Sequence, residues 1–153
     1  MAINLKNFLL SQNRKSIIGH FQDLDHIDGV AISTISANLY KDPRDDLVLF
    51  YFRDGANCAS VYTQSKIISE NIKWNLNVKN NSIKALMVNT RNANAFTGKL
   101  GFKGIVQIAE ELSKQLTIKI TQDEENINSV KPNQILFGCT GTIGETFPTE
   151  KIM

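Results

Sequence analysis

The sequence predicts a mixed α/β fold, with one sheet and its helices arranged in layers. Its 153 residues fit about one domain. Several segments of strand length are rich in β-branched or apolar residues, and one long segment repeats apolar residues at helical spacing. Along the chain, an antiparallel hairpin-like region comes first, and a strand, a loop, a helix and a further strand follow it. The chain is 42% hydrophobic and 21% charged, which argues against disorder.

Residues 1–27 are predicted to form an irregular lead-in with one short helix around Asn4 to Gln12. The domain is expected to span residues 28–153. It begins with a strand at 29–36, because this segment is rich in β-branched and small residues.

The next elements resemble a hairpin. A turn cluster with Pro43 precedes the run Leu47 to Arg53 (LVLFYFR), whose continuous apolar character indicates a strand covered on both faces. Asp54-Gly55 is a strong turn signal, so Ala56 to Tyr62 is predicted as the returning strand.

The second half carries the main helix. Residues 63–72 favour a loop with a short helix, and Trp74 to Val78 alternates weakly. Ile83 to Val88 is a predicted strand that enters the polar loop 89–98. A helix should follow Thr97, a suitable N-cap, because apolar residues then recur at helical spacing. These residues are Leu100, Ile105, Ile108, Ala109, Leu112 and Leu116.

A polar loop is predicted at 121–134, followed by a short buried strand, Ile135-Leu136-Phe137. The strand runs directly into Cys139-Thr140-Gly141-Thr142-Ile143-Gly144. The segment Thr149 to Met153 starts a further element.

Charge and cysteine content exclude several classes of protein. The net charge is +2 with both signs interspersed, so neither a nucleic-acid nor a membrane partner is expected. No apolar run approaches the roughly 20 residues that cross a bilayer. Cys58 and Cys139 have no metal-binding spacing, and two free, buried thiols fit a cytoplasmic protein.

Two further patterns favour a plain structural role. His20, Asp23, Asp25 and His26 are metal-ligating residue types, but neighbours in an irregular segment rarely converge on one ion. Gly98, Gly101 and Gly104 form GxxGxxG, which lacks the dinucleotide spacing, so packing at the start of the helix is favoured. No cofactor and no metal are predicted.

The two polar loops are the candidate site. Residues 89–98 carry three asparagines and two threonines, which suit either a site or a turn that satisfies its own backbone. In the second loop, a threonine hydroxyl beside a glycine amide could give two donors to one oxygen, as in an oxyanion hole. Cys139 is a weak nucleophile candidate, because both histidines lie in the distant lead-in.

Together the loops resemble the ornithine acetyltransferase family, the bifunctional glutamate N-acetyltransferases. The family pattern N-S-G-N-A-N-A-C-T-G resembles residues 89–98, and S-T-G-V-I-G resembles residues 139–144. Phe147-Pro148, Lys151-Ile152 and the echo of F-T-x-N at 62–65 agree in order. Thr90-Arg91 replaces the family's Ser-Gly, Phe96 replaces its Cys, and Ser69-Glu70-Asn71-Ile72 replaces its A-A-P-V.

The resemblance implies the layered fold shared with self-cleaving aminopeptidases, and acetyl transfer from N-acetylornithine to glutamate in arginine biosynthesis. The family's nucleophile is the N-terminal Thr of a β chain, released by self-cleavage, usually at Ala-Thr. This sequence has no Ala-Thr and resembles the first part of an α chain. Thr140 and Gly141 would form the oxyanion hole, and the assembly would be α2β2. An aminopeptidase or amidase on the related scaffold, or an inactive fragment needing a complementing β chain, are the alternatives.

Overall fold

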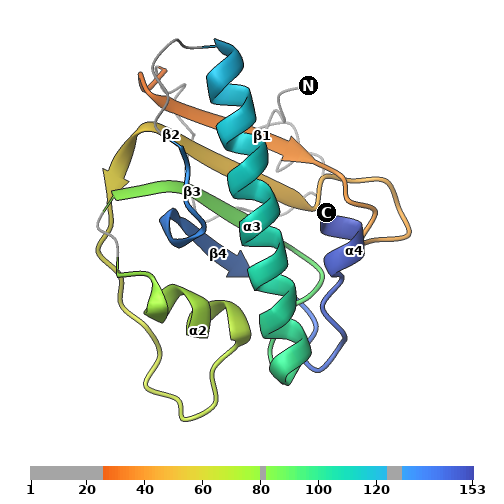
Figure 1. The fold of residues 1–153 in the computed structure, drawn as a ribbon. Coiled ribbons are helices and arrows are strands. Elements are labelled where there is room, and N and C mark those ends of the chain that lie inside the picture. The colour runs from red at the N-terminus through yellow and green to blue at the C-terminus, as the bar shows by residue number, and fades with distance from the viewer. Residues whose placement is uncertain (1–25, 80–81, 124–128) are drawn as a thin grey trace, which may run out of the picture.

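The structure is a computed structural model that describes residues 26–79, 82–123 and 129–153. Its centre is a four-stranded sheet (Figure 1). The strands are β1 (Val30–Ile35), β2 (Leu47–Asn57), β3 (Ser82–Asn89) and β4 (Ile135–Cys139). The mixed α/β class predicted from the sequence is confirmed.

The strands lie in chain order, β1-β2-β3-β4. β1 pairs antiparallel with β2, and β2 with β3, as expected for segments joined by local connections. β4 pairs parallel with β3, which requires a long crossover. That crossover contains the helix α3 (Gly98–Asp123), so the predicted order of strand, loop, helix and strand is confirmed.

Helices cover one face of the sheet. α3 lies across this face, with α2 (Glu70–Asn77) beside it against β4 (Figure 1). The short α4 (Thr149–Ile152) contacts α3, and the 3-10 turn η1 (Pro132–Gln134) leads into β4. Alternate strand residues supply the core beneath the helices, since successive side chains point to opposite faces. The buried apolar cluster is Ala85, Met87, Ile105, Ile108, Ala109, Val130, Ile135, Phe137 and Phe147.

The outer edge of β4 is closed by side chains of α2. Asn75 Nδ2 donates to Phe137 O (2.9 Å), and Phe137 N donates to Asn75 Oδ1 (3.0 Å). Trp74 Nε1 donates to Ile135 O (2.9 Å). These bonds satisfy edge groups that would otherwise be open to another strand.

Two predictions about β2 are wrong. Asp54-Gly55 is no hairpin turn, because β2 continues to Asn57 and bulges between Tyr51 and Ala56. Gly55 has φ +81°, and a Cβ there would lie 2.3 Å from Ser82 Oγ, so close strand approach explains the glycine. The predicted strand Ala56 to Tyr62 is therefore mostly loop.

The sequence also predicts that β2 is covered on both faces. Its side chains on the face away from the core, Val48, Phe50 and Phe52, are only half-buried by the described residues, so this coverage is not observed.

The weak alternation at Trp74 to Val78 does not produce a strand, because the segment lies in α2 up to Asn77 and Val78 caps the helix. Ser69 precedes the helix in extended conformation, and the acidic Glu70 opens the first turn, where the helix dipole favours a negative charge. Trp74 packs edge-on against Phe137, with ring centres 6.0 Å apart. Contacts with β4 and α3 therefore stabilise a helix here, although the local sequence pattern does not favour one.

The main helix is confirmed and is longer than predicted. α3 extends to Asp123, into the predicted polar loop 121–134. Of its predicted apolar face, Leu100 is exposed, whereas Ile105, Ile108 and Ala109 are buried. Thr97 precedes the helix, and its hydroxyl donates to Asn94 Oδ1 (2.6 Å). The helix predicted at Asn4 to Gln12 lies outside the described residues, and the domain boundary at residue 28 stays a prediction.

Candidate active site

The two polar loops singled out in the sequence lie side by side. They follow β3 and β4, and the carboxyl ends of parallel neighbours meet at one edge of the sheet. Backbone bonds join them: Thr140 N to Asn89 O (3.1 Å), Thr142 N to Arg91 O (2.9 Å) and Ala93 N to Thr142 O (3.0 Å). Gly144 N also donates to Ala95 O (2.9 Å). The parallel pairing therefore continues beyond the strands, with a bridge between Asn92 and Thr142.

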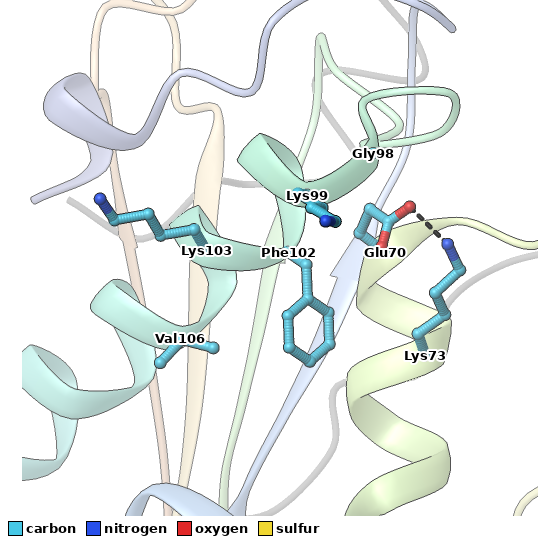
Figure 2. Close-up of a pocket in the computed structure, with 7 residues that line it drawn as sticks. All are labelled: Glu70, Lys73, Gly98, Lys99, Phe102, Lys103 and Val106. Carbon is cyan, nitrogen blue, oxygen red and sulfur yellow. Dashed lines mark hydrogen bonds and ion pairs between the residues drawn. The ribbon is translucent and has the colours of Figure 1, made fainter.

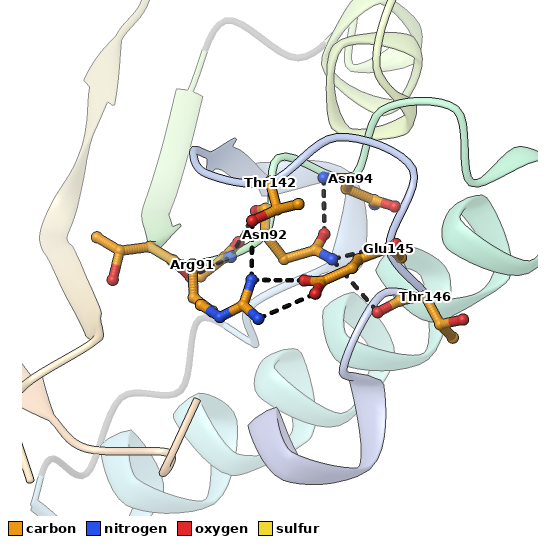
Figure 3. A network of polar contacts seen from close by, with 8 residues as sticks. Arg91, Asn92, Asn94, Thr142, Glu145 and Thr146 are labelled. Carbon is orange, nitrogen blue, oxygen red and sulfur yellow. Dashed lines mark hydrogen bonds and ion pairs between the residues drawn. The ribbon is translucent and has the colours of Figure 1, made fainter. Parts of the chain in front are cut away.

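The asparagines of the first loop are buried tethers. Asn92 Nδ2 donates to Glu145 O (3.1 Å) and Thr146 O (3.3 Å) in the second loop (Figure 3). Asn94 N donates to Asn92 Oδ1 (2.8 Å), and Asn89 Nδ2 donates to Asn92 O (2.9 Å). Of the two roles that the sequence left open, satisfying backbone groups is therefore the one these side chains perform.

Thr140 and Gly141 lie at the exposed turn that follows β4. Gly141 has φ +136°, and a Cβ there would lie 2.2 Å from Arg91 C and 2.7 Å from Asn92 N. Only glycine fits against this peptide unit without displacing it. In the described part of the chain, neither the Thr140 hydroxyl nor the Gly141 amide has a hydrogen-bond partner. Both donors are therefore available to a ligand.

An ion pair that sequence analysis did not predict joins the same loops. Arg91 Nη1 and Nη2 donate to the Glu145 carboxylate (2.5 and 2.9 Å), and Nη1 also donates to Thr142 Oγ1 (2.8 Å) (Figure 3). Glu145 raises the pKa of Arg91, first through these hydrogen bonds and then through its charge. We call Arg91, Thr142 and Glu145 the interloop clamp. Arg91 lies 51 positions from Thr142 and 54 positions from Glu145, so no local pattern signals the pairing.

A family model described as the ArgJ family matches residues 31–153. The chain belongs to the ArgJ family. The arginine biosynthesis bifunctional protein ArgJ of Bartonella henselae is 33% identical over 136 residues. That alignment covers 88% of this chain and 30% of the relative. The protein of the same name from Bradyrhizobium diazoefficiens is 33% identical over 130 residues, 84% of this chain and 29% of the relative. The chain thus spans about a third of the length of these relatives.

Solved structures agree on the fold. The ornithine acetyltransferase of Mycobacterium tuberculosis, solved in complex with ornithine, gives a TM-score of 0.73 at 22% identity, over 82% of this chain and 62% of that one. The arginine biosynthesis bifunctional protein ArgJ of Bacillus halodurans gives 0.67 at 24% identity, over 82% and 60%. The predicted family and fold are confirmed.

Cys139 of this ArgJ-family chain is a packed residue. It lies on the core face of β4, half-buried against the apolar cluster, and burial raises the pKa of its thiol to about 12. This environment disfavours the thiolate that a nucleophilic cysteine needs. Cys58 is also free but exposed, so its predicted burial is wrong.

The two thiols are expected to differ in alkylation. At pH 8, a pKa of about 12 leaves about one Cys139 thiol in ten thousand ionised. Iodoacetamide should therefore modify Cys58 and spare Cys139 in the folded chain, as measured by peptide mass spectrometry. Modification of both in unfolding buffer is the control. Equal labelling in the folded chain would contradict the packed role and restore Cys139 as a nucleophile candidate.

Of the other two candidate motifs, the first lies mostly outside the described residues. Within the ranges that the structure describes, no three histidine, cysteine or acidic residues are grouped to hold a metal ion. Of the proposed metal cluster, His20, Asp23 and Asp25 lie outside those ranges. No helix in the described portion is long and apolar enough to span a bilayer.

Two of the three glycines of GxxGxxG, Gly101 and Gly104, serve packing at the start of α3. A Cβ on Gly101 would lie 2.0 Å from Thr97 Oγ1, and one on Gly104 would lie 2.3 Å from Thr149 Oγ1. An open cavity of about 560 Å³ lies beside the start of α3 and is lined by residues of α3 and α2 (Figure 2). Its lining residues are Glu70, Lys73, Gly98, Lys99, Phe102, Lys103 and Val106. The buried Glu70 carboxylate pairs with Lys73 Nζ at 2.6 Å.

Proposed function

We propose that this chain is the first part of the α chain of a glutamate N-acetyltransferase of arginine biosynthesis. The nucleophile would be the N-terminal Thr of a β chain, in an α2β2 assembly located in the cytoplasm. The observation that carries the proposal is the turn at Thr140 and Gly141, where two adjacent donors stand exposed and without partners in the described residues. Membership of the ArgJ family supports acyl transfer over peptide or amide hydrolysis.

The chemistry requires two acyl transfers. The amine of the β-chain Thr would take the proton from its own hydroxyl, and the oxygen would attack the acetyl carbonyl of N-acetylornithine. The resulting tetrahedral oxyanion would collapse to an acetyl ester and expel ornithine, whose nitrogen takes up a proton. The amine of glutamate would then attack that ester through a second oxyanion and regenerate the Thr hydroxyl.

Both oxyanions need donors placed before the charge develops. The Thr140 hydroxyl and the Gly141 amide would supply them, and one such donor lowers the barrier by about 3–4 kcal/mol. A fixed backbone makes the donors effective, because no reorganisation is then needed during the reaction. The bonds from Thr140 N to Asn89 O and from Thr142 N to Arg91 O hold the turn on both sides.

Substrate profiling tests the assignment. The complete α chain that contains this segment is produced together with the nucleophile-bearing β chain encoded by the same organism and is supplied with N-acetylornithine and glutamate. Release of ornithine with stoichiometric formation of N-acetylglutamate is expected. Hydrolysis of peptides or simple amides without acetyl exchange would favour the aminopeptidase or amidase alternative.

The 153-residue chain alone is expected to transfer no acetyl group from N-acetylornithine. The donors at Thr140 and Gly141 stabilise charge but cannot attack a carbonyl in place of the missing Thr amine and hydroxyl. Incubation with isotope-labelled glutamate, followed by mass spectrometry, measures the product. Turnover by the purified chain above a buffer blank would contradict the placement of the nucleophile on a separate chain.

A further inference from the structure

The backbone of Arg91 is in direct contact with the turn that carries the two free donors. A Cβ on Gly141 would lie 2.2 Å from Arg91 C and 2.4 Å from Arg91 O, so no gap separates the two segments. Arg91 O also accepts the hydrogen bond of Thr142 N at 2.9 Å. A displacement of the Arg91 peptide must therefore displace Gly141.

The side chain of Arg91 ties the first loop to Thr142 and Glu145, which follow Gly141 in the second loop. Its guanidinium bonds both oxygens of Glu145 and the hydroxyl of Thr142, so one planar group joins three points of the two loops. The side chains of Arg91 and Glu145 are 36% and 46% exposed. Ion pairs with this exposure add little to the free energy of unfolding, so the clamp acts on geometry more than on stability.

The backbone conformation of Arg91 also indicates that its contacts hold it in place. Its φ is +77°, in the left-handed region that glycine adopts freely and that residues with a Cβ avoid. Backbone strain of this kind persists where surrounding contacts fix it, and it gathers at functional sites. Here the fixing contacts are those of the interloop clamp, which glycine could not make.

We propose that Arg91 is a positioning residue that holds the Thr140–Gly141 turn in its active geometry, acting through Glu145 and Thr142. The inference rests on the proposed function, because the turn matters only if it binds the oxyanion. The strand ladder holds the turn from the β4 side, through Thr140 N and Asn89 O. The clamp holds it from the opposite side, directly after Gly141.

Two mild variants open the clamp in the complete α chain assembled with its β chain. Arg91→Lys keeps the charge but loses the planar fork, and Glu145→Gln removes the charge but keeps the shape. Arg53→Lys is the matched control, because Arg53 on β2 also bonds both oxygens of a carboxylate, Asp28, at 3.2 Å. The Arg53 side chain is 44% exposed, close to the exposure of Arg91.

Local hydrogen exchange and kinetics are then measured on the same samples. Peptides covering 89–98 and 139–147 are expected to exchange up to about fivefold faster in both clamp variants, with exchange elsewhere unchanged. The kcat for acetyl transfer should fall about tenfold while KM stays nearly constant. Misplaced donors weaken the stabilisation of the transition state much more than they weaken substrate binding. The double variant should match either single variant, since both break one interaction.

The inference is overturned by unchanged exchange in these peptides, by faster exchange throughout the chain, or by a kcat equal to that of Arg53→Lys. Comparison with Thr140→Ala separates the two proposals. If Thr140→Ala slows the reaction and the clamp variants do not, only the positioning role fails. If none of these variants slows it, the oxyanion assignment itself fails.

Discussion

Replacing Thr140 by alanine in the assembled enzyme is expected to slow acetyl transfer about a hundred- to a thousandfold. The substitution removes one of two donors and leaves the Gly141 amide to hold the oxyanion alone. The KM for N-acetylornithine should change much less, because the ground-state carbonyl depends on that donor less than the transition state does. Steady-state kinetics on processed protein measure both constants, since self-cleavage slows as well if it uses the same donors.

Two variants make the result specific to the hydroxyl. Thr140→Ser retains the donor and loses only a methyl group, so most of the rate should remain. Thr146→Ala removes a hydroxyl from an exposed threonine of the same loop and should leave kcat unchanged. A processed Thr140→Ala enzyme that acetylates glutamate at the unmodified rate would make Thr140 a structural turn residue.

Gly141→Ala is expected to abolish acetyl transfer and to lower the free energy of unfolding by about 3 kcal/mol or more. The new Cβ would meet the Arg91–Asn92 peptide at 2.2 Å, and φ +136° is unfavourable for alanine. The two loops would have to separate, and the bond from Thr142 N to Arg91 O would be lost with them. Chemical denaturation and activity assays on one preparation measure the two effects.

Gly144→Ala is the matched control, three residues along the same loop. Its φ of +81° is equally unsuited to alanine, but a Cβ there meets nothing within 4 Å. It should cost only about 1 kcal/mol from backbone strain and retain measurable activity. Equal losses in both variants would show that strain, and not the close contact with Arg91, requires the glycine at 141.

The sequence predicts elements best where a pattern is long or reinforced by its neighbours. Ile105, Ile108 and Ala109 repeat at helical spacing within α3, and all three are buried as that spacing predicts. The strands predicted at 29–36 and 83–88 are found at Val30–Ile35 and Ser82–Asn89, within a residue of their predicted limits. Asp54-Gly55 fails because a glycine with positive φ serves a bulge as well as a turn, and only pairing with β3 decides between them.

The candidate site was predictable in its parts. The loops could be assigned to strand ends from local sequence alone, and the family resemblance names Thr140 and Gly141 as the donor pair. The interloop clamp could not, because Arg91 and Glu145 are brought together only by the parallel pairing of β3 with β4. The burial of Asn92 and Asn94 depends on the same pairing. From composition alone, the asparagine-rich loop therefore fitted a functional site and a self-satisfied turn equally well.

The parallel pairing also sets the order in which this protein can assemble. β1, β2 and β3 are joined by antiparallel pairing between neighbours in the chain, whereas Asn89 meets Cys139 only after the intervening segment, with α3, has been closed into a loop. Closing that loop costs chain entropy before any contact is gained, so long-range pairing of this kind forms slowly. During synthesis, the first loop leaves the ribosome well before its partner exists. The turn at Thr140 and Gly141 therefore takes shape only after that loop has closed, and a chain halted before β4 would carry α2, α3 and the three antiparallel strands without this turn.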